Sequence, residues 1–210
     1  MHHRAAHVEG VSVRPWVLLD CDGVLLDWES GLEQHMRTHH AHVWTGYKND
    51  HAYDLARRYS MDAPQADHII TDFHTHDAYA HLQPLPGATT AIKHLHKFCR
   101  LAVITASGTH ELTQHMRRHN LAHMFGDVFE HVHCTDTFDE KRSYLAQYPP
   151  GYWVEDHAHN ALMGVELGHD SYLIHAAYNQ MDHTPQVTRV HNMLQAAELI
   201  LESLRAKHLI

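Results

Sequence analysis

The feature that most constrains the fold is the way short apolar runs end in polar residues. Residues 16–19 lead into Asp-Cys-Asp-Gly at 20–23, residues 101–104 into Thr105, and residues 152–154 into Glu-Asp at 155–156. Short apolar runs closed by polar turns are typical of buried parallel strands. Stretches with helical spacing separate these runs. We therefore predict an α/β fold, a doubly wound, Rossmann-like parallel sheet.

The remaining elements follow from the same patterns. Two more strands are expected at residues 128–133 and 172–174, and a helix at 109–119 with Asn120 as its C-terminal cap. Other helices are expected at residues 29–40, 88–98, 137–147, 158–167 and 192–207. Residues 44–81 hold no apolar run of the strand type and are mostly helical in pattern. We predict a core domain of residues 14–27 and 83–210, with a helical cap inserted at 28–82.

Composition excludes several classes of protein. The chain has 210 residues, and 16 Lys and Arg against 25 Asp and Glu give a net charge of −9, which argues against a partner that is a nucleic acid polymer. No apolar run approaches the ~20 residues of a membrane span. The first residues lack the apolar stretch of a signal peptide, so a cytoplasmic location is expected. The three cysteines form no C-x-x-C pair, which indicates neither a disulfide framework nor a cysteine zinc site.

The carboxyl ends of parallel strands meet at one edge of the sheet, so the polar residues there should converge. Several carboxylates in one place repel one another, and burial would raise their pKa values. A divalent cation with oxygen ligands, Mg²⁺ above all, resolves that conflict. A cation, a lysine and a hydroxyl suit a phosphoryl group, and one carboxylate is then available as nucleophile. The residues concerned are Asp20, Asp22, Thr105, Lys141, Glu155 and Asp156.

These residues also form ordered motifs. Residues 20–24 read DxDGV, Thr105 is a threonine at a strand end, Lys141 opens a predicted helix, and the Glu-Asp pair at 155–156 has Asn160 shortly after it. In this order they resemble the four motifs of the haloacid dehalogenase (HAD) superfamily. The resemblance covers nearly the whole chain from residue 16 and leaves room for a cap between the first two motifs.

The resemblance implies a role for each motif residue. Asp20 would be the nucleophile that forms an aspartyl-phosphate, and Asp22 the general acid and base. An aspartate at position 22 favours a phosphatase over a dehalogenase, which lacks it. The implied cofactor is Mg²⁺, held by Asp20, the Asp22 carbonyl, Asp156, and Glu155 directly or through water. The implied phosphate ligands are Thr105, Lys141 and the backbone amides near Gly23 and Ala106.

Four further residues are candidates for substrate contact or for support of the site: Ser107, His157, Asn160 and Trp28. Two alternatives stay open for individual residues. Glu155 can support the ligands instead of binding metal, and Ser107 can cap the following helix.

The expected substrate is a small phosphorylated metabolite. Short fragments at residues 22–28, 84–88 and 177–179 resemble the 5′(3′)-deoxyribonucleotidase branch, whose cap aromatics stack on a base. Candidate aromatic residues are Trp28, Trp44, Tyr47 and Phe73. The Glu-Asp pair at 155–156 departs from the double aspartate of that branch, so a phosphoglycolate or sugar-phosphate phosphatase, or a phosphomutase, is the alternative. The sequence leaves the oligomeric state open.

Histidine is unusually frequent, at 27 residues. Several lie in H-x-H pairs, but on a helix residues i and i+2 diverge by about 200° and chelate poorly. His115, His119 and His123 have the i,i+4 spacing that suits a metal, although Asn120 is expected to end their helix. We interpret most histidines as a solvated surface. A histidine-rich metal-binding protein on an inactive HAD scaffold is the non-enzyme alternative.

Overall fold

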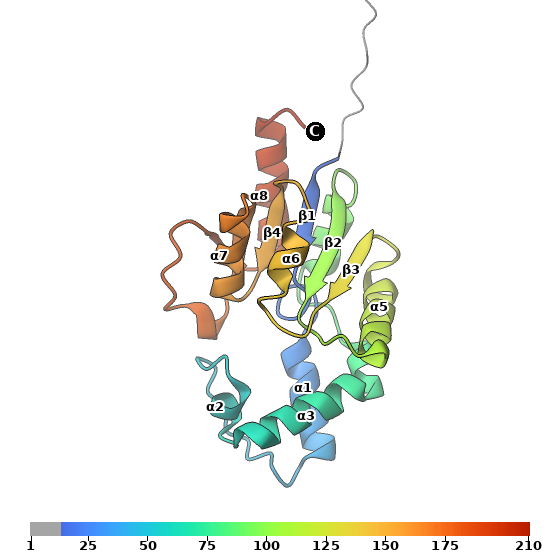
Figure 1. Cartoon of the computed structure of the whole chain (residues 1–210), viewed down its shortest axis with the longest axis vertical. Coiled ribbons are helices and arrows are strands. Elements are labelled where there is room, and N and C mark those ends of the chain that lie inside the picture. The colour runs from blue at the N-terminus through green and yellow to red at the C-terminus, as the bar shows by residue number, and fades with distance from the viewer. Residues whose placement is uncertain (1–13) are drawn as a thin grey trace, which may run out of the picture.

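The computed structural model describes residues 14–210 and contains a six-stranded, all-parallel sheet (Figure 1). The strand order is β3-β2-β1-β4-β5-β6, the arrangement of a doubly wound fold, as predicted. The strands are β1 (Trp16–Leu19), β2 (Arg100–Thr105), β3 (His131–Cys134), β4 (Tyr152–Glu155), β5 (Asp170–Ile174) and β6 (Thr188–Val190).

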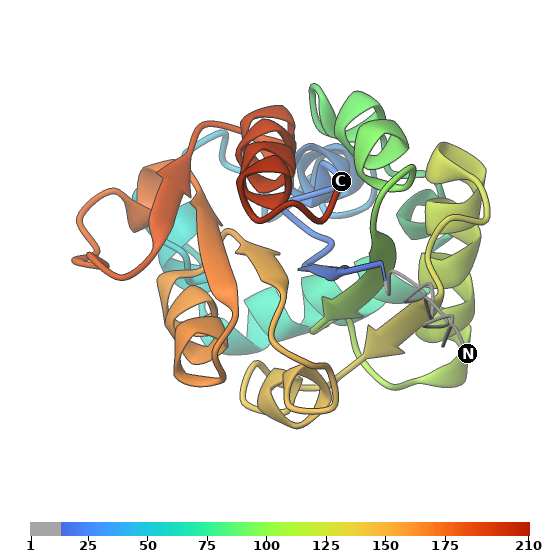
Figure 2. The same cartoon turned by 90° about the horizontal axis from the view of Figure 1, so that it is seen from above.

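Helices cover both faces of the sheet (Figure 2). The helices α4 (Ala88–Leu95) and α8 (Met193–Ala206) pack together on one face, and α6 (Lys141–Leu145) and α7 (Ala158–Glu166) lie on the other. The helix α5 (Glu111–Phe125) packs against α4. Such two-sided cover explains why the central strands are apolar throughout instead of alternating with polar residues.

Successive residues of β1 divide between the two cores, because strand side chains point to opposite faces in turn. Val17 and Leu19 belong to the larger core, with Ile92 of α4 and Ile200 of α8. Leu18 belongs to a second cluster that includes residues of α6 and α7. The burial of β1 on both sides fixes the position of the acidic segment that follows it.

The segment between β1 and α4 extends beyond the carboxyl ends of the strands (Figure 1). It holds α1 (Trp28–His39), α2 (Leu55–Tyr59), α3 (Ala63–Thr75) and the 3-10 helix η1 (Asp77–His81). Asp27 caps α1 by accepting from the Ser30 N–H at 3.1 Å, and Asp62 forms a capping box with Gln65 at the start of α3. This segment contains no strand, as expected of a cap, while the division at residues 28–82 stays a prediction.

Three details of the sequence prediction are wrong. The helix α5 runs through Asn120 to Phe125. The Asn120 side-chain amide is buried and donates to the Leu82 carbonyl outside the helix at 3.0 Å, so Asn120 does not need to cap the helix to find a hydrogen-bond partner. The third strand begins later than expected, at His131. The short strand β6 was missed, because its Arg189 interrupts the apolar pattern.

No helix in residues 14–210 has the length and apolarity needed to cross a membrane.

Candidate active site

The sheet places three predicted site segments next to one another, since β1 lies between β2 and β4. Asp20 follows β1, and its backbone N–H donates to the Val154 carbonyl of β4 at 2.9 Å. Thr105 is the last residue of β2, and Glu155 the last of β4. All three are buried, so the polar strand ends converge on the same edge as the sequence indicates.

Lys141 is the cation at the centre of this edge. It is the first residue of α6 and is fully buried, with its Nζ 2.9 Å from Asp20 Oδ1 and 2.8 Å from Glu155 Oε1. Burial opposes its charge, but the two carboxylates outweigh burial and raise its pKa. Lys141 therefore stays charged and fixes the side chains of Asp20 and Glu155.

Glu155 is held as a carboxylate by four donors. Besides Lys141, the Asn160 amide donates to Oε1 at 2.7 Å, and the backbone N–H groups of Asp156 and His157 donate to Oε2 at 2.8 and 2.7 Å. Burial opposes ionisation, yet Lys141 and these hydrogen bonds keep the pKa of Glu155 below its usual range. Both of its oxygens are thus already engaged, which favours a supporting role for Glu155.

Asp20 and Asp156 differ from Glu155 in that their pKa values are raised. Burial raises the pKa of Asp20, with Lys141 opposing and Glu155 adding to the rise. Burial, followed by the charges of Glu155 and Asp20, raises the pKa of Asp156 well above its usual range. These two carboxylates repel each other in a site with too little positive charge to balance them.

This donor set fits a magnesium ion. One oxygen each from Asp20, Glu155 and Asp156 lies within 4.8 Å of the other two. All the donors are carboxylate oxygens, the ligands that Mg²⁺ prefers, and a cation would relieve their repulsion. Gly23 belongs to the same arrangement: its φ is +76°, and a Cβ there would lie 2.1 Å from Asp156 Oδ2. Any larger residue at position 23 would therefore displace the Asp156 carboxylate.

Asp22 turns toward a different cation, Arg117 of α5. Arg117 Nη2 donates to Asp22 Oδ1 at 2.7 Å and to Oδ2 at 2.6 Å, and it also contacts the Tyr79 hydroxyl. The guanidinium is fully buried, whereas the Asp22 side chain is 24% exposed. Burial raises the pKa of Asp22, and Arg117 opposes the rise. A raised pKa suits a carboxyl group that must carry a proton.

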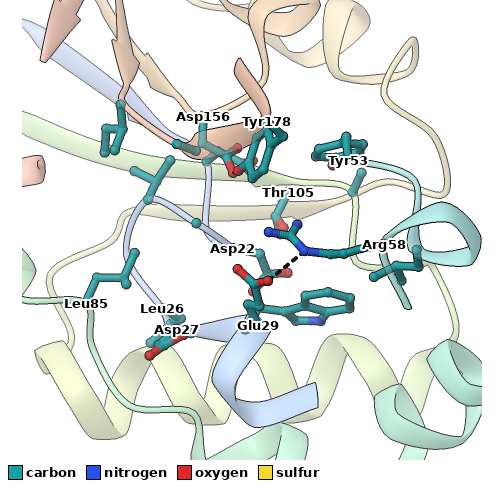
Figure 3. Close-up of a pocket in the computed structure, with 18 of the residues that line it drawn as sticks. Asp22, Leu26, Asp27, Glu29, Tyr53, Arg58, Leu85, Thr105, Asp156 and Tyr178 are labelled. Atoms are coloured by element: carbon teal, nitrogen blue, oxygen red, sulfur yellow. Dashed lines mark hydrogen bonds and ion pairs between the residues drawn. The ribbon is translucent and has the colours of Figure 1, made fainter. Parts of the chain in front are cut away.

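A cavity of about 800 Å³ opens above these residues and is bounded on the other side by the segment that contains α1, α2 and α3. Asp20, Asp22 and Asp156 line its floor. Figure 3 shows Arg58 extending from α2 into the pocket, opposite Asp156 and Tyr178. The Arg58 side chain is 8% exposed, and its Nε lies 2.7 Å from Glu29 Oε1.

Comparisons with solved structures agree with this fold. A HAD-like family hydrolase from Streptococcus pneumoniae superposes with a TM-score of 0.62 and 14% identity, covering 90% of this chain and 98% of that one. An L-2-haloacid dehalogenase from Xanthobacter autotrophicus gives 0.59 and 14%, with 90% and 99% covered. The protein CbbY from Rhodobacter sphaeroides, with bound phosphate, gives 0.57 and 17%, with 87% and 96% covered. This chain has the HAD-like fold. No protein-family model and no curated protein matches its sequence.

Within this HAD-like fold, the four residues expected to bind phosphate lie around one cavity. Gly23, Thr105, Ala106 and Lys141 all line the cavity. Ser107 is buried beside them, and its hydroxyl has no hydrogen-bond partner within residues 14–210. The expectation that Ser107 caps the next helix is wrong, because α5 begins at Glu111 with His110 as its cap.

The supporting candidates have distinct positions. Asn160 is buried outside the cavity lining, where its side-chain amide donates to Glu155. His157 caps α7 and packs its ring against Tyr53, with centroids 4.6 Å apart. Trp28 lines the cavity, and its indole N–H donates to His74 Nε2 at 3.0 Å. Of the other aromatics considered for base stacking, Phe73 is buried in the core, and neither Trp44 nor Tyr47 lines the cavity.

Sequence reasoning missed three residues of the site. Arg58 and Arg117 come from helices, and no motif marks them. Tyr178 of the 3-10 helix η2 (Ala177–Asn179) donates its hydroxyl to Asp156 Oδ2. The fragment that contains Tyr178 resembles one branch of the superfamily, but that resemblance predicts no contact between Tyr178 and Asp156.

Proposed function

We propose that this protein is a Mg²⁺-dependent phosphomonoester hydrolase that acts through an aspartyl-phosphate. The observation that carries the proposal is the buried set of Asp20, Glu155 and Asp156 around Lys141 at the floor of a cavity. This set combines a nucleophile, Asp20, with a fixed cation, Lys141, and with carboxylates that can bind a metal cation. Such an arrangement favours transfer of a phosphoryl group, whose charge develops on several oxygens.

The attacking atom follows from the hydrogen bonds of Asp20. Oδ1 accepts from Lys141 Nζ at 2.9 Å and from the Cys21 N–H at 2.7 Å, which leaves Oδ2 to attack phosphorus. As the P–O bond to the substrate alcohol breaks, Asp22 gives its proton to the leaving oxygen. Asp22 then removes a proton from water, which attacks the aspartyl-phosphate, releases phosphate and restores Asp20.

Mg²⁺ would be held by Asp20, Asp156 and the Asp22 carbonyl, with Glu155 behind them, and it would offset negative charge on the phosphoryl oxygens. Thr105 and the amides near Gly23 and Ala106 would hold those oxygens in place. Ser107 is a further candidate, because its buried hydroxyl is unpartnered.

The opposite wall of the cavity supports one substrate class. Arg58 supports a small phosphate ester with a second anionic group, because its guanidinium lies in the same cavity as the catalytic floor. One structural neighbour, CbbY, is described in complex with xylulose-1,5-bisphosphate. A sugar bisphosphate or phosphoglycolate fits this wall. A nucleoside monophosphate remains the second substrate class, with Trp28 as the one predicted aromatic residue that lines the cavity.

A panel of phosphomonoesters tests the proposal. Phosphate release with Mg²⁺ is measured for sugar bisphosphates, sugar phosphates, phosphoglycolate and nucleoside and deoxynucleoside monophosphates, comparing the wild type with Asp20→Asn. We expect release by the wild type alone. Equal release by Asp20→Asn removes Asp20 as nucleophile. Halide release from an L-2-haloacid without any phosphate release would make the protein a dehalogenase, as two of its structural neighbours are.

A further inference from the structure

A second group of metal-ligand side chains lies in the segment between β1 and α4, apart from the carboxylates of the floor. His35, His39 and His76 each offer a ring nitrogen within 4.8 Å of the other two. His35 and His39 share one face of α1 at the i,i+4 spacing, and His76 caps the end of α3. This i,i+4 pair is separate from the H-x-H pairs and from the spaced histidines at residues 115–123.

His35 supplies the observation that points to a ligand. Its side chain has 0% exposure, and its Nε2 lies 2.9 Å from Asp72 Oδ2. The other ring nitrogen, Nδ1, is buried and has no hydrogen-bond partner within residues 14–210. A buried polar atom without a hydrogen bond destabilises the folded protein. Because Asp72 occupies Nε2, Nδ1 is the His35 nitrogen that remains free to bind a ligand together with His39 and His76.

The surroundings of His35 match those of a metal-bound histidine. Such histidines usually donate their second ring N–H to a carboxylate, which fixes the tautomer and the ring orientation, as Asp72 does here. Burial lowers the pKa of His35, with Asp72 opposing, so the ring is neutral at neutral pH. His40 also binds Asp72 Oδ2, at 2.8 Å, which holds the carboxylate in place.

We propose that His35, His39 and His76 bind a divalent late first-row transition metal, of which Zn²⁺ is the representative, with Asp72 as the positioning residue of His35. Imidazole ligands select such ions over Mg²⁺, which requires oxygen. His76 Nδ1 accepts a hydrogen bond from the Ala78 N–H, and this bond would be lost when that nitrogen binds the metal. A surface hollow of about 380 Å³ that borders His35 and His39 provides an entry path and room for a water ligand.

The site would join α1 to the end of α3, two helices that border the active-site cavity. Metal binding would therefore stabilise this segment without contributing to the chemistry at Asp20. The proposal does not depend on the phosphatase reaction, and Mg²⁺ in excess keeps the carboxylate floor occupied during the test.

The test is a titration of the full chain with Co²⁺, followed by the visible absorption of tetrahedral Co²⁺, in excess Mg²⁺. The wild type should show one equivalent of this absorption, which Zn²⁺ abolishes. His39 is exposed, so His39→Gln should fold normally and weaken Co²⁺ binding by about 100-fold, and Asp72→Asn should weaken it by about tenfold. Metal-free melting temperatures check folding.

The matched control is His123→Gln. His119 and His123 form an i,i+4 pair on α5 with stacked rings, but they belong to no group of three ligands found in residues 14–210. Their substitution should leave the tetrahedral absorption unchanged. No such absorption in the wild type, or an equal loss in His39→Gln and His123→Gln, would overturn the proposal.

Discussion

At the scale of single residues, the partner of Asp22 decides how that carboxylate can act. Arg117 of α5 is fully buried and donates to both carboxylate oxygens of Asp22. An acid that protonates a leaving group needs a fixed position as well as a suitable pKa. In the proposed reaction Arg117 supplies the position, and it is itself hydrogen-bonded to the Tyr79 hydroxyl.

Arg117→Met should lower kcat by about 100-fold, near the lower end of the range for lost general acid–base catalysis. Substrate affinity should change little, because Arg117 does not line the cavity. Steady-state kinetics check this, with Arg118→Met, an exposed neighbour on the same helix, as the control. An unchanged kcat in Arg117→Met would exclude this role.

At the scale of elements, the turn after β1 and the helix α2 define the two walls of the site. The turn needs glycine at position 23, where φ is positive and Asp156 fills the space of a side chain. The helix α2 carries Arg58 into the cavity and leaves its neighbour Arg57 exposed. Each wall therefore offers one variant that can be compared with a matched control.

Gly23→Ala should raise the Mg²⁺ concentration for half-maximal activity by about tenfold or more, because the new Cβ displaces Asp156. Gly126→Ala is the control. Gly126 also has a positive φ, +79°, but nothing lies within 4 Å of a Cβ there, so only backbone strain of about 1–3 kcal/mol remains. Equal Mg²⁺ dependence in both variants would contradict the assignment of Asp156 as a ligand.

Arg58→Met should raise KM about tenfold for esters with a second anionic group, the effect expected of one lost charge-assisted hydrogen bond. It should leave KM unchanged for an ester whose only anionic group is the phosphate itself, such as p-nitrophenyl phosphate. Arg57→Met should affect neither substrate. An equal effect of Arg58→Met on both kinds of ester would exclude Arg58 from substrate recognition.

The same elements show what could be predicted from the sequence. Asp20, Thr105 and Glu155 were predictable because each directly follows or ends an apolar strand, and parallel strands end at one edge. Arg58 and Arg117 were not, because they reach the site from helices through tertiary packing that no local pattern records. The prediction that Asn120 ends its helix is wrong for the same reason, because the Asn120 amide donates to Leu82, which is far away in the sequence.

At the scale of the whole molecule, 27 histidines make the charge depend strongly on pH. The net charge is −9 with neutral histidines and should change sign just below neutrality, since the isoelectric point is about 6.3. His74 differs from most of them because it lines the cavity, hydrogen-bonded to Trp28 and packed against Tyr79. Burial, and then the Arg117 charge, lowers its pKa to about 3.

The low pKa of His74 predicts a loss of stability on acidification. Below pH 6.5 the unfolded chain takes up a proton that the folded chain refuses until about pH 3, so stability falls as pH falls through this window. Between pH 7 and 5 this contributes about 2 kcal/mol. Urea unfolding should show His74→Gln losing less stability over this interval than the wild type. Equal losses would contradict the prediction.

The most direct test of the central claim is the detection of phosphate on Asp20. The enzyme is mixed with its best substrate and Mg²⁺, quenched in acid within one turnover and digested, and the peptide carrying Asp20 is analysed by mass spectrometry. We predict a phosphoryl adduct on this peptide that borohydride reduces at Asp20 and that is absent from Asp20→Asn. Phosphate release without any adduct at early times would mean that water attacks the substrate directly, which contradicts the account.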